Sequence, residues 1–246
     1  RLVASADVFV QNFRPGVIER MGLGEEKLRK VAPNLVMVSI SGFGDTGPYS
    51  QRPVYDPLIQ GLSGLATVQA GADELRPQLV RTILPDKLTG VTAAQAITAA
   101  LFARERTGES QHVRLSMLDA IIAFLWSSDM GSQTFVHSEV PQQEAASLQD
   151  LIYETTTGYI TIAVQSDREW QALIRAVDRP EWAEDPRFLT ARLRQENIDA
   201  RLELIQSVIK TDTAEHWLAR LEAEQVPCAP VLTRTQVLDH PQVLAN

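Results

Sequence analysis

The stretch from residue 84 to residue 118 constrains the fold more than any other part of the chain. It opens with Pro85-Asp86, continues through small and apolar residues to Arg104-Glu105-Arg106, and reaches Gly108. Basic residues suit the negative end of a helix dipole, and glycine readily adopts the left-handed conformation that ends many helices. Residues 111–117 then alternate polar and apolar, which is the period of a strand. We therefore expect a buried helix, a turn and a strand, with Asp86 at the start of the helix.

Asp86 has two interpretations at that position. Aspartate is a preferred N-cap residue, because its carboxylate accepts the free N–H groups of the first turn. A carboxylate at the start of a helix can also serve a reaction. The spacing alone favours the cap, so the choice depends on the surrounding sequence.

Composition narrows the class of protein. The chain has 246 residues, of which 44% are hydrophobic and 22% charged, as in ordinary globular proteins of one or two domains. Its net charge of −8 argues against a nucleic-acid partner, which usually requires a basic face. A phosphorylated small ligand stays possible, because a few local arginines are sufficient to bind it.

Three further features bear on partners and location. No apolar run approaches the roughly 20 residues that span a bilayer, so we expect no membrane partner. Cys228 is the only cysteine, which excludes an intramolecular disulfide and fits a reducing compartment such as the cytoplasm. The four histidines are scattered and show no metal-binding spacing, so we expect no metal and treat them as surface or structural residues.

The first half of the chain alternates strand-like and helix-like segments. This alternation indicates an α/β fold with a parallel sheet, whose ligands usually bind beyond the carboxyl ends of the strands. The glycine-rich segment 41–48 follows one of these strands and matches no phosphate-binding glycine motif. The predicted elements are strands 7–11, 35–40 and 79–84, and helices 17–21, 25–31, 53–66 (with Asp56 as a capping acid) and 119–126.

The second half has a different pattern, typical of a small α+β domain. Residues 127–150 are polar and poorly periodic, which predicts a linker. Residues 226–231 contain two prolines and therefore predict an edge strand. The other predicted elements are a strand at 159–164, a helix at 168–177 capped by Asp167, and amphipathic helices at 197–209 and 213–224.

Several phrases in this order resemble a known family, the class III CoA-transferases, which includes formyl-CoA transferase, carnitine CoA-transferase and alpha-methylacyl-CoA racemase. The resemblance covers nearly the whole chain. The phrases are ADVFVQNFRPG at 6–16, SGFG at 41–44, GPY at 47–49, RPVYD at 52–56, QGLSG at 60–64, Asp86 with Gly90, ERTGESQ at 105–111, GYI at 158–160, DPRF at 185–188 and VPCAPV at 226–231.

The resemblance implies a Rossmann-like large domain, a small α+β domain and an interlocked homodimer. On this basis we expect residues 1–126 to form part of the large CoA-binding domain, which would be incomplete at its N-terminus. Residues 127–150 would be the linker and 151–232 the small domain. Residues 233–246 would begin the segment that returns to the large domain.

The resemblance also implies roles for individual residues. Asp86 falls on the catalytic aspartate, and Asp56 on an acidic position close to it. The stretch that holds the nucleotide part of CoA corresponds to Asn12, Phe13, Arg14, Arg20 and Met21. The segment along the pantetheine and thioester corresponds to Arg52, Pro53, Val54, Tyr55 and Asp56. The glycine-rich lid of formyl-CoA-type transferases has no clear counterpart, and residues 144–147 match it poorly.

The function implied is a CoA-transferase that moves CoA from an acyl-CoA donor to a small carboxylic acid. Coenzyme A would enter as the acyl-CoA substrate, and the reaction would pass through a covalent aspartyl intermediate without a metal. One alternative is an acyl-CoA racemase or epimerase, although a catalytic histidine of racemases is replaced here by Tyr55. A second alternative is a non-catalytic CoA-binding or dimer-forming remnant.

Overall fold

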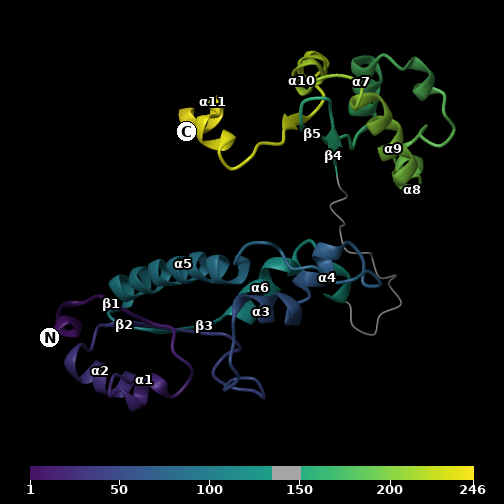
Figure 1. Ribbon diagram of the computed structural model, residues 1–246. Helices are drawn as coiled ribbons and strands as arrows, with labels where there is room; N and C mark the ends of the chain where they lie inside the picture. The colour runs from purple at the N-terminus through teal and green to yellow at the C-terminus, as the bar shows by residue number, and fades with distance from the viewer. Residues whose placement is uncertain (135–150) are drawn as a thin grey trace. The chain divides into compact units, whose positions relative to one another are not determined.

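The structure is a computed structural model that describes residues 1–134 and 151–246 (Figure 1). The chain divides into two units, residues 1–147 (unit 1) and 148–246 (unit 2). This division lies within the predicted linker 127–150, most of which falls outside the described residues, as does the weak lid match at 144–147. The predicted domain boundaries stay predictions.

Unit 1 is built on a parallel sheet with strand order β1-β2-β3, as the alternation of elements predicts. The strands are β1 (Val8–Gln11), β2 (Val36–Ser41) and β3 (His112–Ser116). Val10 pairs with Val38, and Val38 pairs with Val113. The helices are η1 (Leu2–Ser5), α1 (Val17–Arg20), α2 (Glu25–Val31), α3 (Asp56–Leu62), α4 (Leu65–Ala70), α5 (Leu84–Thr107), α6 (Met117–Trp126) and η2 (Gly131–Thr134).

Side-chain alternation in β2 divides the core of unit 1 between the two faces of the sheet. Val36 and Val38 point to the face where α5 contributes Ala100, whereas Met37 points to the face where α2 contributes Leu28. In Figure 1 the strands lie between α5 on one side and α1 with α2 on the other. The continuous apolar sequence of β2 is therefore explained by burial on both faces.

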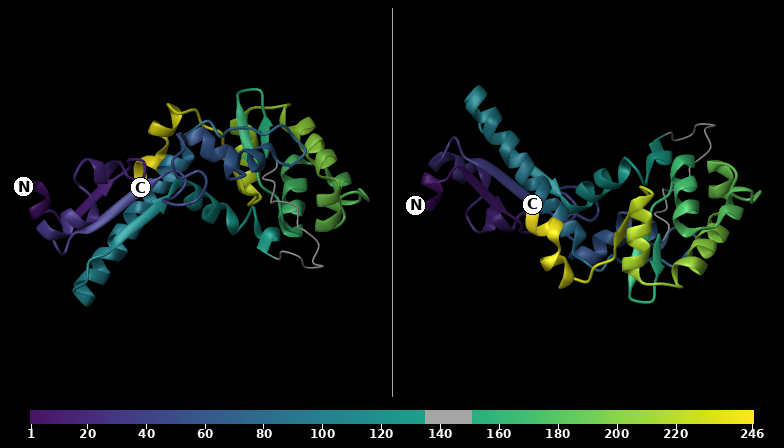
Figure 2. Two further views of the ribbon diagram at one scale, coloured as in Figure 1. Left: turned by 90° about the horizontal axis from the view of Figure 1, so that it is seen from below. Right: turned by 90° about the horizontal axis from the view of Figure 1, so that it is seen from above.

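Helix α5 is the long element predicted from 84–108, shown in teal beside the strands in Figure 2. It ends at Gly108, whose φ of 74° is the left-handed conformation expected there. The expectation of a buried helix is wrong for most of its surface. Only a narrow stripe that includes Thr89, Ala93 and Ala100 is buried, because just one side of α5 faces the sheet and α6.

Two other expectations for unit 1 are corrected. The helix predicted at 53–66 starts later and is split into α3 and α4 by Gly64, whose φ of 86° is left-handed. The strand predicted at 79–84 is absent from the described residues. Segment 78–82 is held instead by one hydrogen bond to Ala66 O and by several to the side chain of Gln60.

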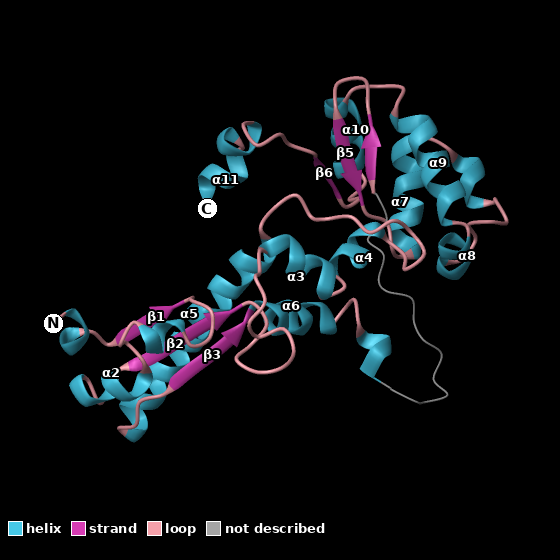
Figure 3. Cartoon of the chain, turned by 60° about the horizontal axis from the view of Figure 1, so that its bottom comes forward, coloured by secondary structure: helices cyan, strands magenta, loops and turns pink. Residues whose placement is uncertain are grey.

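Unit 2 contains an antiparallel sheet with strand order β4-β5-β6, formed by β4 (Ile152–Glu154), β5 (Tyr159–Ile162) and β6 (Cys228–Pro230). Strand β6 is an edge, as its prolines predict. Figure 3 shows these strands in magenta beside the helices of the unit. The helices are α7 (Asp167–Val177), η3 (Pro180–Ala183), α8 (Ala191–Glu196), α9 (Ile198–Ile209), α10 (Ala214–Ala223), η4 (Gln236–Asp239) and α11 (Pro241–Ala245).

The start of α7 differs from the expected cap. Ser166, not Asp167, is the N-cap residue, and it forms a capping box with Glu169. The carboxylate of Asp167 is free to bind the guanidinium of Arg194, whose side chain is buried. Among the described residues, no helix is both long and apolar enough to cross a membrane.

Candidate active site

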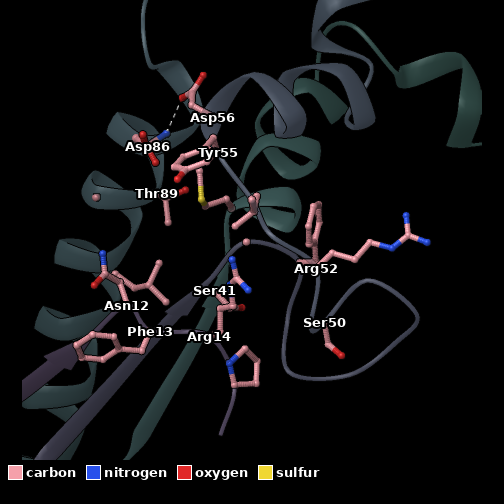
Figure 4. A pocket seen from close by; sticks show the side chains of 17 residues that line it. Asn12, Phe13, Arg14, Ser41, Ser50, Arg52, Tyr55, Asp56, Asp86 and Thr89 are labelled. Carbon is pink, nitrogen blue, oxygen red and sulfur yellow. Dashed lines mark hydrogen bonds between the residues drawn. The ribbon is translucent and has the colours of Figure 1, made fainter. Parts of the chain in front are cut away.

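A cavity of about 490 Å³ lies in unit 1 at the carboxyl end of the parallel sheet. Its walls come from the segments that follow β1 and β2, from residues 50–56, and from the first turns of α5 and α6. Asp86 is one of the lining residues, and we refer to this cavity as the Asp86 cavity. Figure 4 shows Asp86 and Asp56 at one end of the cavity, with Asn12, Phe13 and Arg14 toward the other end.

Asp86 is in the first turn of α5, and its side chain is exposed to the cavity. The interpretation of Asp86 as the N-cap is wrong: the N-cap residue is Ile83, which makes no side-chain cap. No described residue donates a hydrogen bond to the Asp86 carboxylate. The cavity therefore contains a carboxylate that has no structural partner among these residues.

Asp56 is 4% exposed and lies beside Asp86. Its Oδ2 accepts a hydrogen bond of 3.1 Å from the backbone N–H of Asp86, and its Oδ1 accepts one of 2.6 Å from Gln60 Nε2. Tyr55, not Asp56, is the N-cap of α3, so Asp56 does not cap its own helix. Its carboxylate instead satisfies one of the free N–H groups at the start of α5.

Two effects raise the pKa of Asp86. Partial burial disfavours the charged carboxylate, and the negative charge of Asp56 disfavours it further. A carboxyl group whose pKa is raised by burial and a like charge, in a cavity, is a candidate functional group. The same two effects leave the ionised form less stabilised than a carboxylate in water, which favours reaction with an electrophile.

Of the residues expected to hold the nucleotide, some line the Asp86 cavity and others do not. Asn12, Phe13 and Arg14 line the Asp86 cavity directly after β1. The Phe13 N–H is held by Gln11 Oε1 at 2.8 Å, while the Arg14 guanidinium binds no described acidic side chain. Arg20 and Met21, at the end of α1, line neither of the two cavities described for unit 1. Their binding role stays a prediction.

The segment expected along the thioester is also divided. Arg52, Val54 and Tyr55 line the cavity, whereas Pro53 does not. The guanidinium of Arg52 lies over the Tyr49 ring, 3.6 Å from its centroid, and points away from Asp86 in Figure 4. Tyr55 is 77% exposed, and its hydroxyl has no hydrogen-bond partner among the described residues.

Close packing explains one glycine of the loop after β2. A Cβ on Gly42 would lie 2.4 Å from Val54 Cγ1, so only glycine allows the two wall segments to approach this closely. By contrast, a Cβ on Gly90 would meet no atom within 4 Å. Gly90 therefore makes no close helix contact among the described residues, and it leaves open space in the cavity wall one turn after Asp86.

Several lining residues were not predicted from the sequence. Some lie in phrases of the family resemblance that carried no residue role, such as SGFG at 41–44, and their place at the carboxyl edge of the sheet is the signal that could have found them. Thr89 is buried, and its hydroxyl is satisfied because Oγ1 donates to Pro85 O at 2.7 Å. The unpredicted residues are Pro15, Ile40, Ser41, Gly42, Phe43, Ser50, Thr89 and Met117.

A second cavity of about 250 Å³ adjoins the first and shares four lining residues with it, Phe13, Pro15, Ile40 and Ser41. In its wall, His112 Nδ1 lies 2.6 Å from Glu25 Oε2, and His112 Nε2 lies 2.8 Å from Ser39 Oγ. His112 thus has the structural role expected for it. Burial alone would raise the pKa of Glu25, but hydrogen bonds from His112 and Arg29 outweigh burial and lower it. No cluster of three or more potential metal ligands occurs in the described residues.

The fold and cavity define an α/β protein with an accessible carboxylate at the edge of a parallel sheet, and sequence comparison identifies the family. Residues 1–246 match the family model of CoA-transferase family III. The chain therefore belongs to CoA-transferase family III.

Individual relatives agree with this assignment. The acetyl-CoA:oxalate CoA-transferase of Acetobacter aceti is 33% identical over 251 residues, which cover 100% of this chain and 64% of that protein. The succinyl-CoA:glutarate CoA-transferase of Homo sapiens is 29% identical, with 100% and 56% covered. Less than two thirds of the length of each of these relatives is thus spanned by the chain.

Two solved structures are similar to this chain in both fold and sequence. The crystal structure of Rv3272 from Mycobacterium tuberculosis in its orthorhombic form has a TM-score of 0.82 and 30% identity, covering 100% of this chain and 65% of that one. The crystal structure of a CAIB/BAIF family protein from Brucella suis has a TM-score of 0.84 and 32% identity, covering 99% and 65%.

Proposed function

We propose that the protein is a CoA-transferase in which Asp86 exchanges CoA between an acyl-CoA donor and a carboxylic acid acceptor. One observation carries the proposal: the Asp86 carboxylate, unpaired among the described residues, is exposed in the cavity at the carboxyl end of the sheet. Named relatives transfer CoA to or from oxalate, succinate or glutarate, which suggests small dicarboxylic acids as the first acceptors to test.

The first half of the reaction transfers CoA to the protein. A carboxylate oxygen of Asp86 attacks the thioester carbonyl carbon, the C–S bond breaks, and CoA leaves as its thiolate. The product is a mixed anhydride between Asp86 and the acyl group. The thiolate then attacks Cγ of Asp86, which releases the donor acid as a carboxylate and leaves an aspartyl-CoA thioester.

The second half runs the same steps in reverse with the acceptor. The acceptor carboxylate attacks Cγ of the aspartyl thioester and displaces CoA thiolate, which gives a new mixed anhydride. The thiolate then attacks the acyl carbon of the acceptor. This step forms the new acyl-CoA and restores the Asp86 carboxylate, so atoms and charge balance over the cycle.

Two properties of the site support these steps. The raised pKa of Asp86 means that its charge is poorly stabilised, so reaction with a thioester removes an unfavourable charge. The position of Asp86 in the first turn of a 24-residue helix keeps it near backbone N–H groups and the positive end of the helix dipole. That end can stabilise the oxyanion of each tetrahedral intermediate.

Residues toward the other end of the cavity suit the CoA moiety. Arg14 has a guanidinium free of described acidic partners, and a guanidinium binds phosphate oxygens in pairs. Phe13 offers an exposed ring for the adenine base, and Asn12 offers an amide. We include Arg20, Met21 and Pro53 in the proposed CoA site on the family resemblance alone. The homodimer and the cytoplasmic location are likewise proposals.

The test uses Asp86→Asn, which keeps the shape of the side chain but removes the nucleophile. We expect CoA exchange between an acyl-CoA and oxalate, succinate or glutarate to fall by at least about 10³-fold. Asp73→Asn, in an exposed segment of the same unit, is the matched control and should exchange at the wild-type rate. Full turnover by Asp86→Asn would refute the assignment of the nucleophile.

A trapping experiment tests the covalent step separately. Hydroxylamine added with acyl-CoA should convert Asp86 to its hydroxamate, which mass spectrometry of peptides identifies. Modification only at other carboxylates would contradict the aspartyl intermediate. Deuterium uptake at the carbon next to the thioester, without any acceptor acid, would favour the racemase instead.

A further inference from the structure

Gln60 has a buried amide that connects the two carboxylates to the segment before α5. The residue lies on α3, one turn after Asp56, and is 2% exposed. Its Nε2 donates to Asp56 Oδ1 at 2.6 Å and to Thr82 O at 3.2 Å, and its Oε1 accepts from Val80 N at 2.9 Å. Every polar atom of the amide therefore has a partner.

These contacts allow only one orientation of the amide. A flipped amide would place its oxygen against Asp56 Oδ1 and Thr82 O, and its N–H₂ group against the N–H of Val80. Acceptors would then face acceptors, and a donor would face a donor. Gln60 is thus a rigid bridge between Asp56 and residues 80–82.

The bridge determines where Asp86 lies. Segment 80–82 leads directly into α5, whose N-cap Ile83 supplies no side-chain cap. The missing cap comes from Asp56 Oδ2, which accepts the N–H of Asp86 at 3.1 Å. Figure 4 shows this hydrogen bond as the dashed line between the two residues. Gln60 therefore holds both the carboxylate that caps α5 and the backbone that enters it.

Charge makes this arrangement dependent on Gln60. No described Lys, Arg or His pairs with the buried Asp56 carboxylate, which relies on the two N–H groups of Gln60 and Asp86. A buried carboxylate that loses one of its few donors is drawn toward water or toward other donors. Such a movement would displace the cap beneath Asp86.

We propose that Gln60 is a positioning residue for Asp86: by fixing the Asp56 carboxylate and segment 80–82, it presents the Asp86 carboxylate to the cavity. This inference rests on the proposed CoA exchange at Asp86. It assigns Gln60 no contact with substrate.

Two variants test the proposal. Gln60→Leu removes both sides of the bridge, and we expect CoA exchange to fall about 10²-fold, the usual effect of misplacing a reacting group by about 1 Å. Gln60→Glu has nearly the same shape and can donate to Asp56 only while its carboxyl group is protonated. We therefore expect Gln60→Glu to approach wild-type exchange at weakly acidic pH and to lose it as the pH rises.

Ser63→Ala is the matched structural control. Ser63 is buried in the same unit just after α3, where its Oγ contacts Gln60 O and Leu65 N, both at 3.4 Å, and it does not contact Asp56. We expect this variant to lose stability without any change in the pH profile of exchange. If Gln60→Glu also kept the wild-type profile, or if Gln60→Leu exchanged at the wild-type rate, the positioning role would be wrong.

A second readout separates this inference from the function on which it rests. A water-soluble carbodiimide labels protonated carboxyl groups, so the pH dependence of labelling at Asp86 reports its titration. Gln60→Leu should shift that dependence, whereas Ser63→Ala should not. Absence of exchange in the wild type would refute the transferase, while the labelling profile of Asp86 would still decide the role of Gln60.

Discussion

Unit 2 places its apolar side chains in one large core, whereas unit 1 divides them among several smaller clusters around an open cavity. The core of unit 2 includes Trp170, whose ring centroid lies 6.1 Å from that of Trp182 and 5.6 Å from that of Phe188. Its buried Arg194 is paired with Asp167 and Phe188 O. In unit 1 the buried charge of Asp56 is met only by N–H groups and lies beside a second carboxylate.

This difference suggests that the core of unit 2 serves mainly stability, whereas the cavity of unit 1 serves mainly chemistry. A unit with a continuous core gains stability from each buried side chain. In unit 2 this holds even though Trp217 Nε1 is buried without a hydrogen-bond partner among the described residues. A unit that keeps two carboxylates close together, one of them open to a cavity, retains an unfavourable interaction that a reaction can use. We therefore expect core substitutions in unit 2 to act mainly on folding and substitutions around Asp86 to act mainly on exchange.

The largest effect on folding is expected for Trp170→Ala. Trp170 is 2% exposed at the centre of the unit 2 core, so truncation should cost about 3–5 kcal/mol of the free energy of unfolding. Urea denaturation followed by far-UV circular dichroism measures this loss. Hydrogen exchange should locate the faster opening in residues 151–231.

Trp126→Ala is the matched substitution in unit 1. Trp126 is 42% exposed at the end of α6, so the same truncation should cost less than about 1 kcal/mol. Equal losses for the two tryptophans would show that the two units do not differ in the way described.

Gly42→Ala should have the next largest effect. Its Cβ would lie within 2.8 Å of three side-chain carbons of Val54, so the two wall segments must separate, at about 1–3 kcal/mol. Because both residues line the Asp86 cavity, substrate binding should weaken as well, which appears as a raised KM.

Gly61→Ala provides a control of opposite sign. Gly61 is exposed within α3, and a Cβ there meets no atom within 4 Å. Alanine should therefore stabilise the helix by up to about 1 kcal/mol. Thermal unfolding of both variants measures the contrast, and destabilisation by Gly61→Ala would argue against this account of α3.

Ser166→Ala should cost about 1 kcal/mol, the usual value for losing an N-cap. Ser166 Oγ accepts from Glu169 N at 3.2 Å, and Glu169 Oε2 accepts from Ser166 N at 2.9 Å. Hydrogen bonds from the backbone N–H groups of Ser166 and Gln165, and from the Ser166 side chain, lower the pKa of Glu169, so their stabilisation is present at neutral pH and is lost as the pH falls through that lowered pKa. Urea denaturation at neutral and acid pH measures both effects, and exchange activity should not change.

The sequence predicted most regular elements of the fold, because their signals are local. The apolar period of 35–40 and the Gly108 stop of the long helix are properties of single segments. One error is local, because the left-handed Gly64 splits a predicted helix. The other depends on a distant partner, because side-chain hydrogen bonds from Gln60 hold segment 80–82, where the expected strand is absent.

The site shows the same limit. Asp86 and Asp56 were selected by resemblance, and each was expected to cap a helix by spacing. Neither prediction of a cap could foresee that Asp56 caps the helix of Asp86, because the two residues are 30 positions apart. Gln60 was passed over for the same reason, since its partners at 80 and 82 become neighbours only after folding.

The smallest expected effect is a gain in stability from Asp86→Asn, the variant that abolishes exchange. In the wild type, the pKa of Asp86 is raised above its unfolded value by partial burial and by Asp56. Between these two pKa values the native state binds more protons than the unfolded state, so the free energy of unfolding falls as the pH rises. Asparagine does not titrate and therefore escapes this loss. We expect Asp86→Asn to unfold at a slightly higher temperature than the wild type at neutral pH, and the difference to disappear at a pH below the ordinary aspartate pKa. A gain that persisted unchanged into acid would mean that the charge of Asp86 is not opposed by its site, and the contrast between the two units would then lose its electrostatic basis.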